Sequence, residues 1–180
     1  MCDAIRPAEA RRPERPTRLV LCLGNDLRSD DGVGWRVAES LQGRDLPRDV
    51  EVRTSALSGF YLLDEMIGFN RVVIVDAIRS GVHPPGTIHS VPLERIASPD
   101  GPSPHSVGLP TVMATAARCG VPLPQRVHVV AVEAKDMETI GTRLTSAVEG
   151  AVPGAVGAVL KALAEDTEGR VPKPHVRESE

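Results

Sequence analysis

The stretch Leu19-Val20-Leu21-Cys22-Leu23-Gly24-Asn25-Asp26-Leu27-Arg28-Ser29-Asp30-Asp31-Gly32-Val33-Gly34 decides the fold of this 180-residue chain. It opens with a continuous apolar run, which is typical of a strand covered on both faces. A glycine and a polar turn follow. Val33, Val37 and Leu41 then recur four residues apart, which predicts a helix over 32–41. The chain therefore begins with a strand–turn–helix unit.

The same alternation continues along the chain. Because strand-like and helical segments alternate, we predict an α/β fold: a three-layer, mainly parallel twisted sheet of about five strands flanked by helices. The charged, proline-bearing ends are predicted to be disordered tails over 1–17 and 166–180, which leaves one folded domain over 18–165. The expected strands are 18–23, 50–55, 71–77, 86–91 and 126–132. The expected helices are 32–41, 59–67, 107–119 and 144–164, the last broken or kinked near Pro153.

Composition excludes several classes of protein. The formal net charge of −3 and only four aromatic residues give no reason to expect nucleic-acid binding. The cysteines Cys2, Cys22 and Cys119 are scattered without a CxxC pair, which indicates a reducing cytoplasm rather than a disulfide framework. No apolar stretch was expected to approach the ~18 residues that cross a bilayer. We therefore expect a cytoplasmic protein that does not contact a membrane.

Three residues are the main candidates for function: Asp31, Asp76 and His105. Asp31 follows the first predicted strand and its turn. Asp76 follows the run Val72-Val73-Ile74-Val75, and His105 precedes a predicted helix. Ligands of α/β proteins bind where the carboxyl ends of the strands meet. Two carboxylates and an imidazole at that edge would suit a borderline divalent metal.

Each candidate also has a structural interpretation. Asp30 and Asp31 could cap the following helix, as acidic residues often do. A poorly solvated Asp76 needs a partner, a metal or a raised pKa. His105 could be an ordinary hydrogen-bonded histidine, and Cys22 is interpreted as a small core residue. Further along, Glu133 and Asp136 could line the same edge, where we expect them to support the site or be solvated.

Two common functional signatures are missing from the sequence. The first turn lacks the glycine spacing of a dinucleotide-binding loop, and two of its three carboxylates would repel a pyrophosphate docked there. The Gly-x-Ser-x-Gly pattern of a nucleophilic hydrolase is also not found.

Four ordered segments carry a family resemblance: Leu21–Leu27 with Asp30–Gly34, Val75-Asp76-Ala77, Pro85-Gly86-Thr87, and Ser103-Pro104-His105-Ser106-Val107-Gly108-Leu109. Together they resemble the endopeptidases that mature the large subunit of [NiFe] hydrogenases, over nearly the whole folded domain. The resemblance implies a twisted sheet flanked by helices. It also implies an aspartic-type protease that recognises nickel already inserted in the large-subunit precursor and removes a short C-terminal extension.

The family's two metal-binding acids and its histidine fall on Asp31, Asp76 and His105, where the first acid is glutamate in some members. We hypothesise that these residues engage the nickel of the substrate, that water attacks, and that activity falls as the histidine is protonated. Gly24 and Asn25 are expected to shape the cleft through their backbone groups. Two alternatives stay open: a non-catalytic nickel-sensing or chaperone-like module for the same client, and a small-molecule hydrolase with a resident metal. We expect a monomer.

Overall fold

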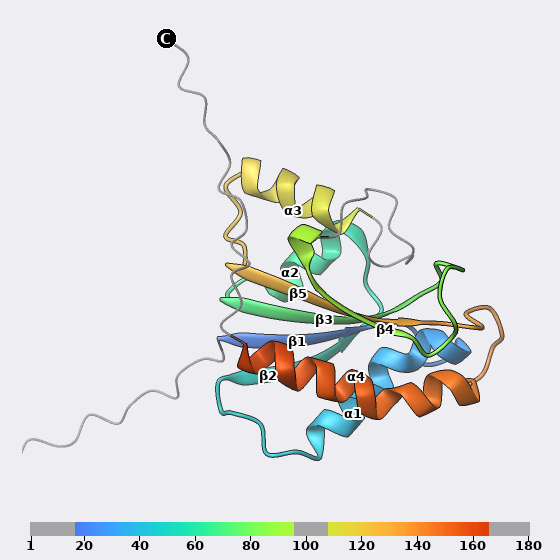
Figure 1. Cartoon of the computed structure of the whole chain (residues 1–180). Coiled ribbons are helices and arrows are strands. Elements are labelled where there is room, and N and C mark those ends of the chain that lie inside the picture. Colours follow the sequence, from blue (N-terminus) through green and yellow to red (C-terminus); the bar gives the residue numbers. More distant parts are fainter. Residues whose placement is uncertain (1–16, 96–107, 166–180) are drawn as a thin grey trace, which may run out of the picture.

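The computed structural model describes residues 17–95 and 108–165 (Figure 1). The predicted tails therefore lie outside the described residues, except Thr17, whose N–H donates to the carbonyl of Asp49 at 3.0 Å. The strands are β1 (Arg18–Leu23), β2 (Val50–Ser55), β3 (Arg71–Ile78), β4 (Ile88–Pro92) and β5 (Arg126–Glu133). The α-helices are α1 (Val33–Gln42), α2 (Leu62–Met66), α3 (Leu109–Arg118) and α4 (Ser146–Ala164). Short 3-10 helices η1 (Ser29–Gly32), η2 (Gly59–Tyr61) and η3 (Leu93–Arg95) complete the elements.

The five strands form one sheet in the order β2-β1-β3-β5-β4. The first four are parallel, and β4 pairs antiparallel with β5 at the edge. The predicted mainly parallel α/β sheet is therefore confirmed. The fourth strand begins two residues later than expected because Thr87 still belongs to the preceding turn, donating its N–H to the carbonyl of Pro84 at 3.1 Å.

The sheet is the middle of three layers, because successive side chains of a strand point to opposite faces. In β1, Val20 and Cys22 pack with α1 and α4, whereas Leu19, Leu21 and Leu23 pack with α2 and α3. Figure 1 shows the two pairs of helices on opposite sides of the strands. Both faces of β1 are buried, which is why its sequence is apolar throughout.

Helix α4 differs from two expectations. It is a single helix with Pro153 inside it, so the predicted break is wrong, and a kink there stays a prediction. By length and composition it is also apolar enough to cross a membrane, so the expectation that no such stretch exists was wrong. Its residues Val148, Ala155 and Val159 are buried in the same cluster as α1 and the sheet. Helix α4 therefore packs here as a core helix of the α/β domain.

The carboxyl ends of β1, β2, β3 and β5 lie along one edge of the sheet, on the right in Figure 1. The connections 24–28, 56–58, 79–87 and 134–145 leave from these ends. At the opposite edge, the guanidinium of Arg18 contacts the carboxylate of Asp49 at 2.6 Å and joins the start of β1 to the residue before β2. The topology thus brings four connections, far apart in the sequence, to one side of the molecule.

Candidate functional site

The turn after β1 is built on Gly24. Its φ is +121°, and a Cβ at this position would lie 1.8 Å from the carbonyl oxygen of Asp31. Only glycine allows the chain to turn back this closely on itself. The carbonyl of Gly24 accepts a hydrogen bond from the indole of Trp35 at 3.2 Å, and its N–H donates to the carbonyl of Ser55. The predicted role of Gly24 in shaping this edge agrees with these contacts.

Asp31 lies in η1 and is buried, with 3% of its surface exposed. Its carboxylate accepts a hydrogen bond from the N–H of Asn25 at 3.0 Å. This contact ties the carboxylate to the turn rather than to the helix that follows. Neither η1 nor α1 has a side-chain cap, so the interpretation of this residue as a helix cap was wrong.

Asp30 is fully buried and faces a different segment. Its carboxylate accepts hydrogen bonds from the N–H groups of Lys135, Asp136 and Thr145 at 2.9, 2.9 and 2.6 Å. The hydroxyl of Thr145 also donates to it at 3.0 Å. Two adjacent aspartates therefore have separate tasks. Asp30 fastens the 134–145 connection to η1, and Asp31 remains at the turn.

Asp76 is fully buried and lies in β3, third from its carboxyl end and paired in register with Ala131 of β5, within the strand that the sequence predicted over 71–77. By strand alternation it shares a face with Ile74 and Ile78, the face that α2 and α3 cover. The 3-10 helix that carries Asp31 packs against β3. The structure therefore brings the elements of the two predicted acids together near the carboxyl edge of the sheet.

His105 lies outside the described residues. The nearest described position is Gly108, the N-terminal cap of α3, with φ of +77°. Helix α3 packs on the face of the sheet to which Asp76 belongs. Across residues 17–95 and 108–165, no three His, Cys, Asp or Glu side chains are grouped closely enough to hold a metal ion. The predicted three-ligand set therefore depends on His105.

Glu133 has a structural role that the sequence analysis left open. It is the last residue of β5, and only 1% of its surface is exposed. Its carboxylate accepts the N–H of Ser80 at 2.7 Å, the hydroxyl of Ser80 at 2.8 Å and the N–H of Gly81 at 3.0 Å. It thereby fixes the connection that leaves β3 after Asp76. The signal was available, because an acid that ends an apolar strand is the same pattern that singled out Asp76.

Asp136 is held in a local turn. Hydrogen bonds from the Thr139 side chain, and from the backbone N–H groups of Thr139 and Glu138, lower its pKa to about 2. It therefore stays ionised and orders the 134–145 connection. This arrangement fits the expectation that Asp136 supports the edge.

Cys22 is unsuited to nucleophilic catalysis. It is fully buried in β1, and burial raises the pKa of its thiol to about 12. Since the thiolate is the reactive form, this side chain is inert at neutral pH. Its interpretation as a small core residue is confirmed.

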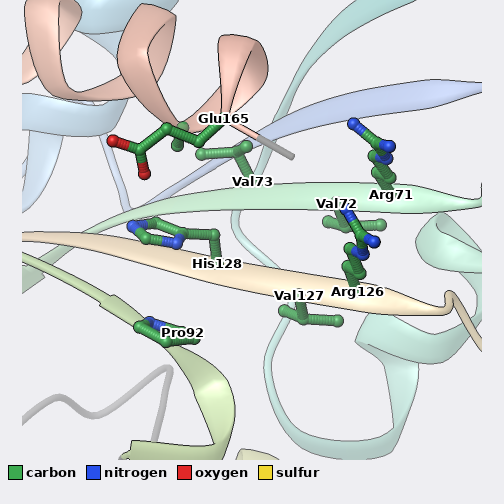
Figure 2. Close-up of a pocket in the computed structure, with 9 residues that line it drawn as sticks. Arg71, Val72, Val73, Pro92, Arg126, Val127, His128 and Glu165 are labelled. Atoms are coloured by element: carbon green, nitrogen blue, oxygen red, sulfur yellow. The ribbon is translucent and has the colours of Figure 1, made fainter. Parts of the chain in front are cut away.

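A small cavity lies between the sheet and the end of α4, and neither Asp31 nor Asp76 lines it (Figure 2). Its volume of about 30 Å³ suits roughly one water molecule. His128 lines it, and its Nε2 is 2.8 Å from the hydroxyl of Ser90. The lining includes the first two residues of β5, Arg126 and Val127, so this cavity is separate from the carboxyl edge.

Comparison with known proteins identifies the family. The sequence profile of hydrogenase maturation proteases matches residues 35–162, a range that contains Asp76 and His105 and begins just after Asp31. The chain belongs to this family. The hydrogenase 2 maturation protease of Escherichia coli (strain K12) is 33% identical over 164 residues, which cover 89% of this chain and 98% of that protein. The hydrogenase expression/formation protein HupD of Rhizobium leguminosarum bv. viciae is 30% identical over 84% of this chain and 76% of its own length.

Solved structures of the family share the fold. The hydrogenase maturating endopeptidase HybD from E. coli superposes with a TM-score of 0.70 at 32% identity, covering 81% of this chain and 91% of that one. The [NiFe] hydrogenase maturation protease HybD from Thermococcus kodakarensis gives a TM-score of 0.61 at 28% identity, covering 82% and 99%. The resemblance found from the sequence motifs, and the enzyme class it implied, are therefore confirmed.

Proposed function

We propose that this protein is an endopeptidase that removes the C-terminal extension of a nickel-loaded [NiFe] hydrogenase large-subunit precursor. Membership of the maturation-protease family supports the reaction and the client. The observation that carries the proposal is the burial of Asp31 and Asp76 at the carboxyl edge of neighbouring strands. Ligands of α/β proteins bind at this edge of the sheet, and two carboxylates there supply oxygen ligands that suit a divalent cation.

In this proposal, Asp31, Asp76 and His105 engage the nickel that the precursor brings, so nickel is part of the substrate. Carboxylate oxygens and a neutral imidazole nitrogen are suitable ligands for a borderline divalent ion. Anchoring the ion would place the precursor's extension across the sheet edge and position the scissile bond. Cys22 is buried in β1 and supplies no nucleophile to this edge, and the attacking group in this proposal is water.

The site is supported by its own framework. Asn25 holds one oxygen of Asp31, and Glu133 fixes the connection after Asp76. Asp30 fastens the neighbouring connection to η1. A site whose supporting groups are bonded in advance loses less entropy when it binds its substrate. We further propose that the protein acts in the cytoplasm, where its scattered cysteines stay reduced.

The test is cleavage of purified precursor followed by intact-mass spectrometry. The wild-type protein should release the C-terminal peptide from nickel-loaded precursor and leave nickel-free precursor intact. Asp76→Asn should abolish release while the protein stays folded. Asp64→Asn, which makes the same change at an exposed acid of α2, should cleave at the wild-type rate.

Each failure has a distinct meaning. Normal cleavage by Asp76→Asn would remove that residue from the mechanism, and equal cleavage without nickel would refute recognition through the metal. Stable binding of the precursor without a change of mass would identify a non-catalytic module instead. Stoichiometric metal in freshly purified protein, with chelator-sensitive hydrolysis of small molecules, would identify a resident-metal hydrolase.

A further inference from the structure

The exposed apolar side chains of this protein gather at the edge that carries the candidate site. Among the described residues, seven large hydrophobic side chains are exposed. Six of them lie in segments that follow the carboxyl ends of β1, β2, β3 and β5. We call these six the apolar rim: Leu27, Leu57, Phe60, Tyr61, Val82 and Ile140. The seventh, Ile67, follows α2 and leads into the amino end of β3, at the opposite edge.

Leu27 and Ile140 form one side of the rim. They are 113 positions apart in the sequence, but a parallel bridge between Arg28 and Gly141 joins their segments. The N–H of Gly141 donates to the carbonyl of Leu27 at 2.9 Å. Ile140 is nevertheless 88% exposed, so the backbone presents the pair to solvent instead of burying it. This segment runs directly into η1, the 3-10 helix that carries Asp31.

The connection after β2 forms the other side. Ser55 accepts the N–H of Gly24 through its carbonyl at 3.2 Å, so this connection starts beside the turn of the candidate site. Phe60 and Tyr61 follow in η2 with 58% and 69% of their surface exposed. The whole chain has only four aromatic residues. Two of them are therefore exposed on this one connection.

We propose that the apolar rim is the docking surface for the folded body of the large-subunit precursor, an inference that rests on the proposed function. A precursor whose extension reaches Asp31 and Asp76 must bring its surface against the connections that flank them. Exposed apolar side chains around a polar site mark protein interfaces, and aromatic residues are enriched at their centres. A polar border is also present, where Arg79 contacts Glu138 at 2.9 Å.

The occupant we assign is the folded precursor, not the extension alone. The rim flanks the site from separate connections, so an extended peptide running to the acids would leave much of it uncovered. Binding the folded body would bury this apolar surface and add affinity without touching the reacting atoms. Substitutions in the rim should therefore act on KM and leave kcat nearly unchanged.

The experiment uses two double variants, Leu27→Ser with Ile140→Ser and Phe60→Ser with Tyr61→Ser. Ile67→Ser is the matched control, since it removes an exposed apolar side chain from the opposite edge. The probe is purified, folded, nickel-loaded large-subunit precursor. Each double variant should raise KM by about tenfold or more, the effect of losing roughly 1.4 kcal/mol of binding. Values of kcat should stay within about twofold, and Ile67→Ser should match the wild type.

Unchanged KM in both folded double variants would overturn the inference. A wild-type dimer in sedimentation equilibrium that either double variant converts to a monomer would also overturn it, because a second copy would then occupy the rim. If the wild type does not cleave the precursor, the proposed function fails on its own. In that case, binding of the intact precursor to the same variants, measured by interferometry, tests separately whether the apolar rim is the docking surface.

Discussion

Replacing Asp30 with alanine should destabilise the protein far more than any nearby surface substitution. The carboxylate of Asp30 is fully buried and accepts four hydrogen bonds, three from backbone N–H groups and one from the hydroxyl of Thr145. Asp30→Ala removes the acceptor from all four donors at once. The 134–145 connection would then lose much of what fastens it to η1.

The size of the effect follows from these contacts. A hydrogen bond to a charged group contributes roughly 1.5–3 kcal/mol, and a buried donor left without an acceptor costs about 1–3 kcal/mol. The contributions do not add fully, because the connection can open and let water satisfy some donors. We expect a loss of about 3–5 kcal/mol from a typical total of roughly 5–15 kcal/mol. For a domain of this size that corresponds to a decrease in Tm of roughly 10 °C.

Urea unfolding measures how much the free energy of unfolding falls in Asp30→Ala, and hydrogen exchange shows which segments lose protection. In Asp30→Ala the amides of Lys135, Asp136 and Thr145 should exchange faster than in the wild type, while those of β1 and β3 stay protected under native conditions. Asp26→Ala, which changes an exposed acid of the 24–28 connection that leads into η1, should stay within about 0.5 kcal/mol of the wild type. An Asp30→Ala protein within about 1 kcal/mol of the wild type would refute the assignment of this carboxylate as the fastening group.

Three further predictions concern the turn, the buried thiol and the amino edge. Gly24→Ala should cost about 3 kcal/mol or more in urea unfolding, since its Cβ would overlap a backbone oxygen at 1.8 Å, whereas Gly43→Ala, with open space around it, should be tolerated. Iodoacetamide at neutral pH should label the exposed Cys119 in the folded protein but should label Cys22 only in denaturant. The reason is that burial raises the pKa of the Cys22 thiol to about 12, and labelling of both cysteines in the folded protein would contradict it. The hydrogen bond from Arg18 lowers the pKa of Asp49. Their ion pair therefore stabilises the fold above the usual carboxyl pKa of about 3.9, and this stabilisation is lost as the pH falls through the lowered pKa. Asp49→Asn should thus cost under about 1 kcal/mol at neutral pH and almost nothing near pH 2, and an equal cost at both would refute the linkage.

Local sequence patterns were sufficient for most of the fold. The first strand, Arg18–Leu23, and the second, Val50–Ser55, have the predicted bounds. The first is a continuous aliphatic run and the second alternates β-branched with polar residues, and both patterns are local signals of a strand. The proline at position 153 did not mark the end of a helix. Helix α4 continues through it because the helix is fixed by packing along its buried face, which outweighs one missing hydrogen bond.

The site was only partly predictable. The sequence indicated that acids follow the apolar strands, and the fold confirms that Asp76 is buried there. It could not distinguish Asp30 from its neighbour, because the groups that distinguish them lie 105 to 115 positions further along the chain. The structural role of Glu133 could not be predicted for a similar reason, since its hydrogen-bond donors belong to the connection after β3.

The amino-acid sequence by itself determined the α/β class, the family and the candidate residues, because apolar periodicity and short motifs are local properties of the chain. The tertiary structure alone decided which aspartate fastens the fold, where β4 runs antiparallel, and which apolar side chains stay exposed on the connections at the carboxyl edge. These outcomes depend on hydrogen bonds and packing between segments far apart in the sequence, which form only when the sheet brings its strand ends to one edge.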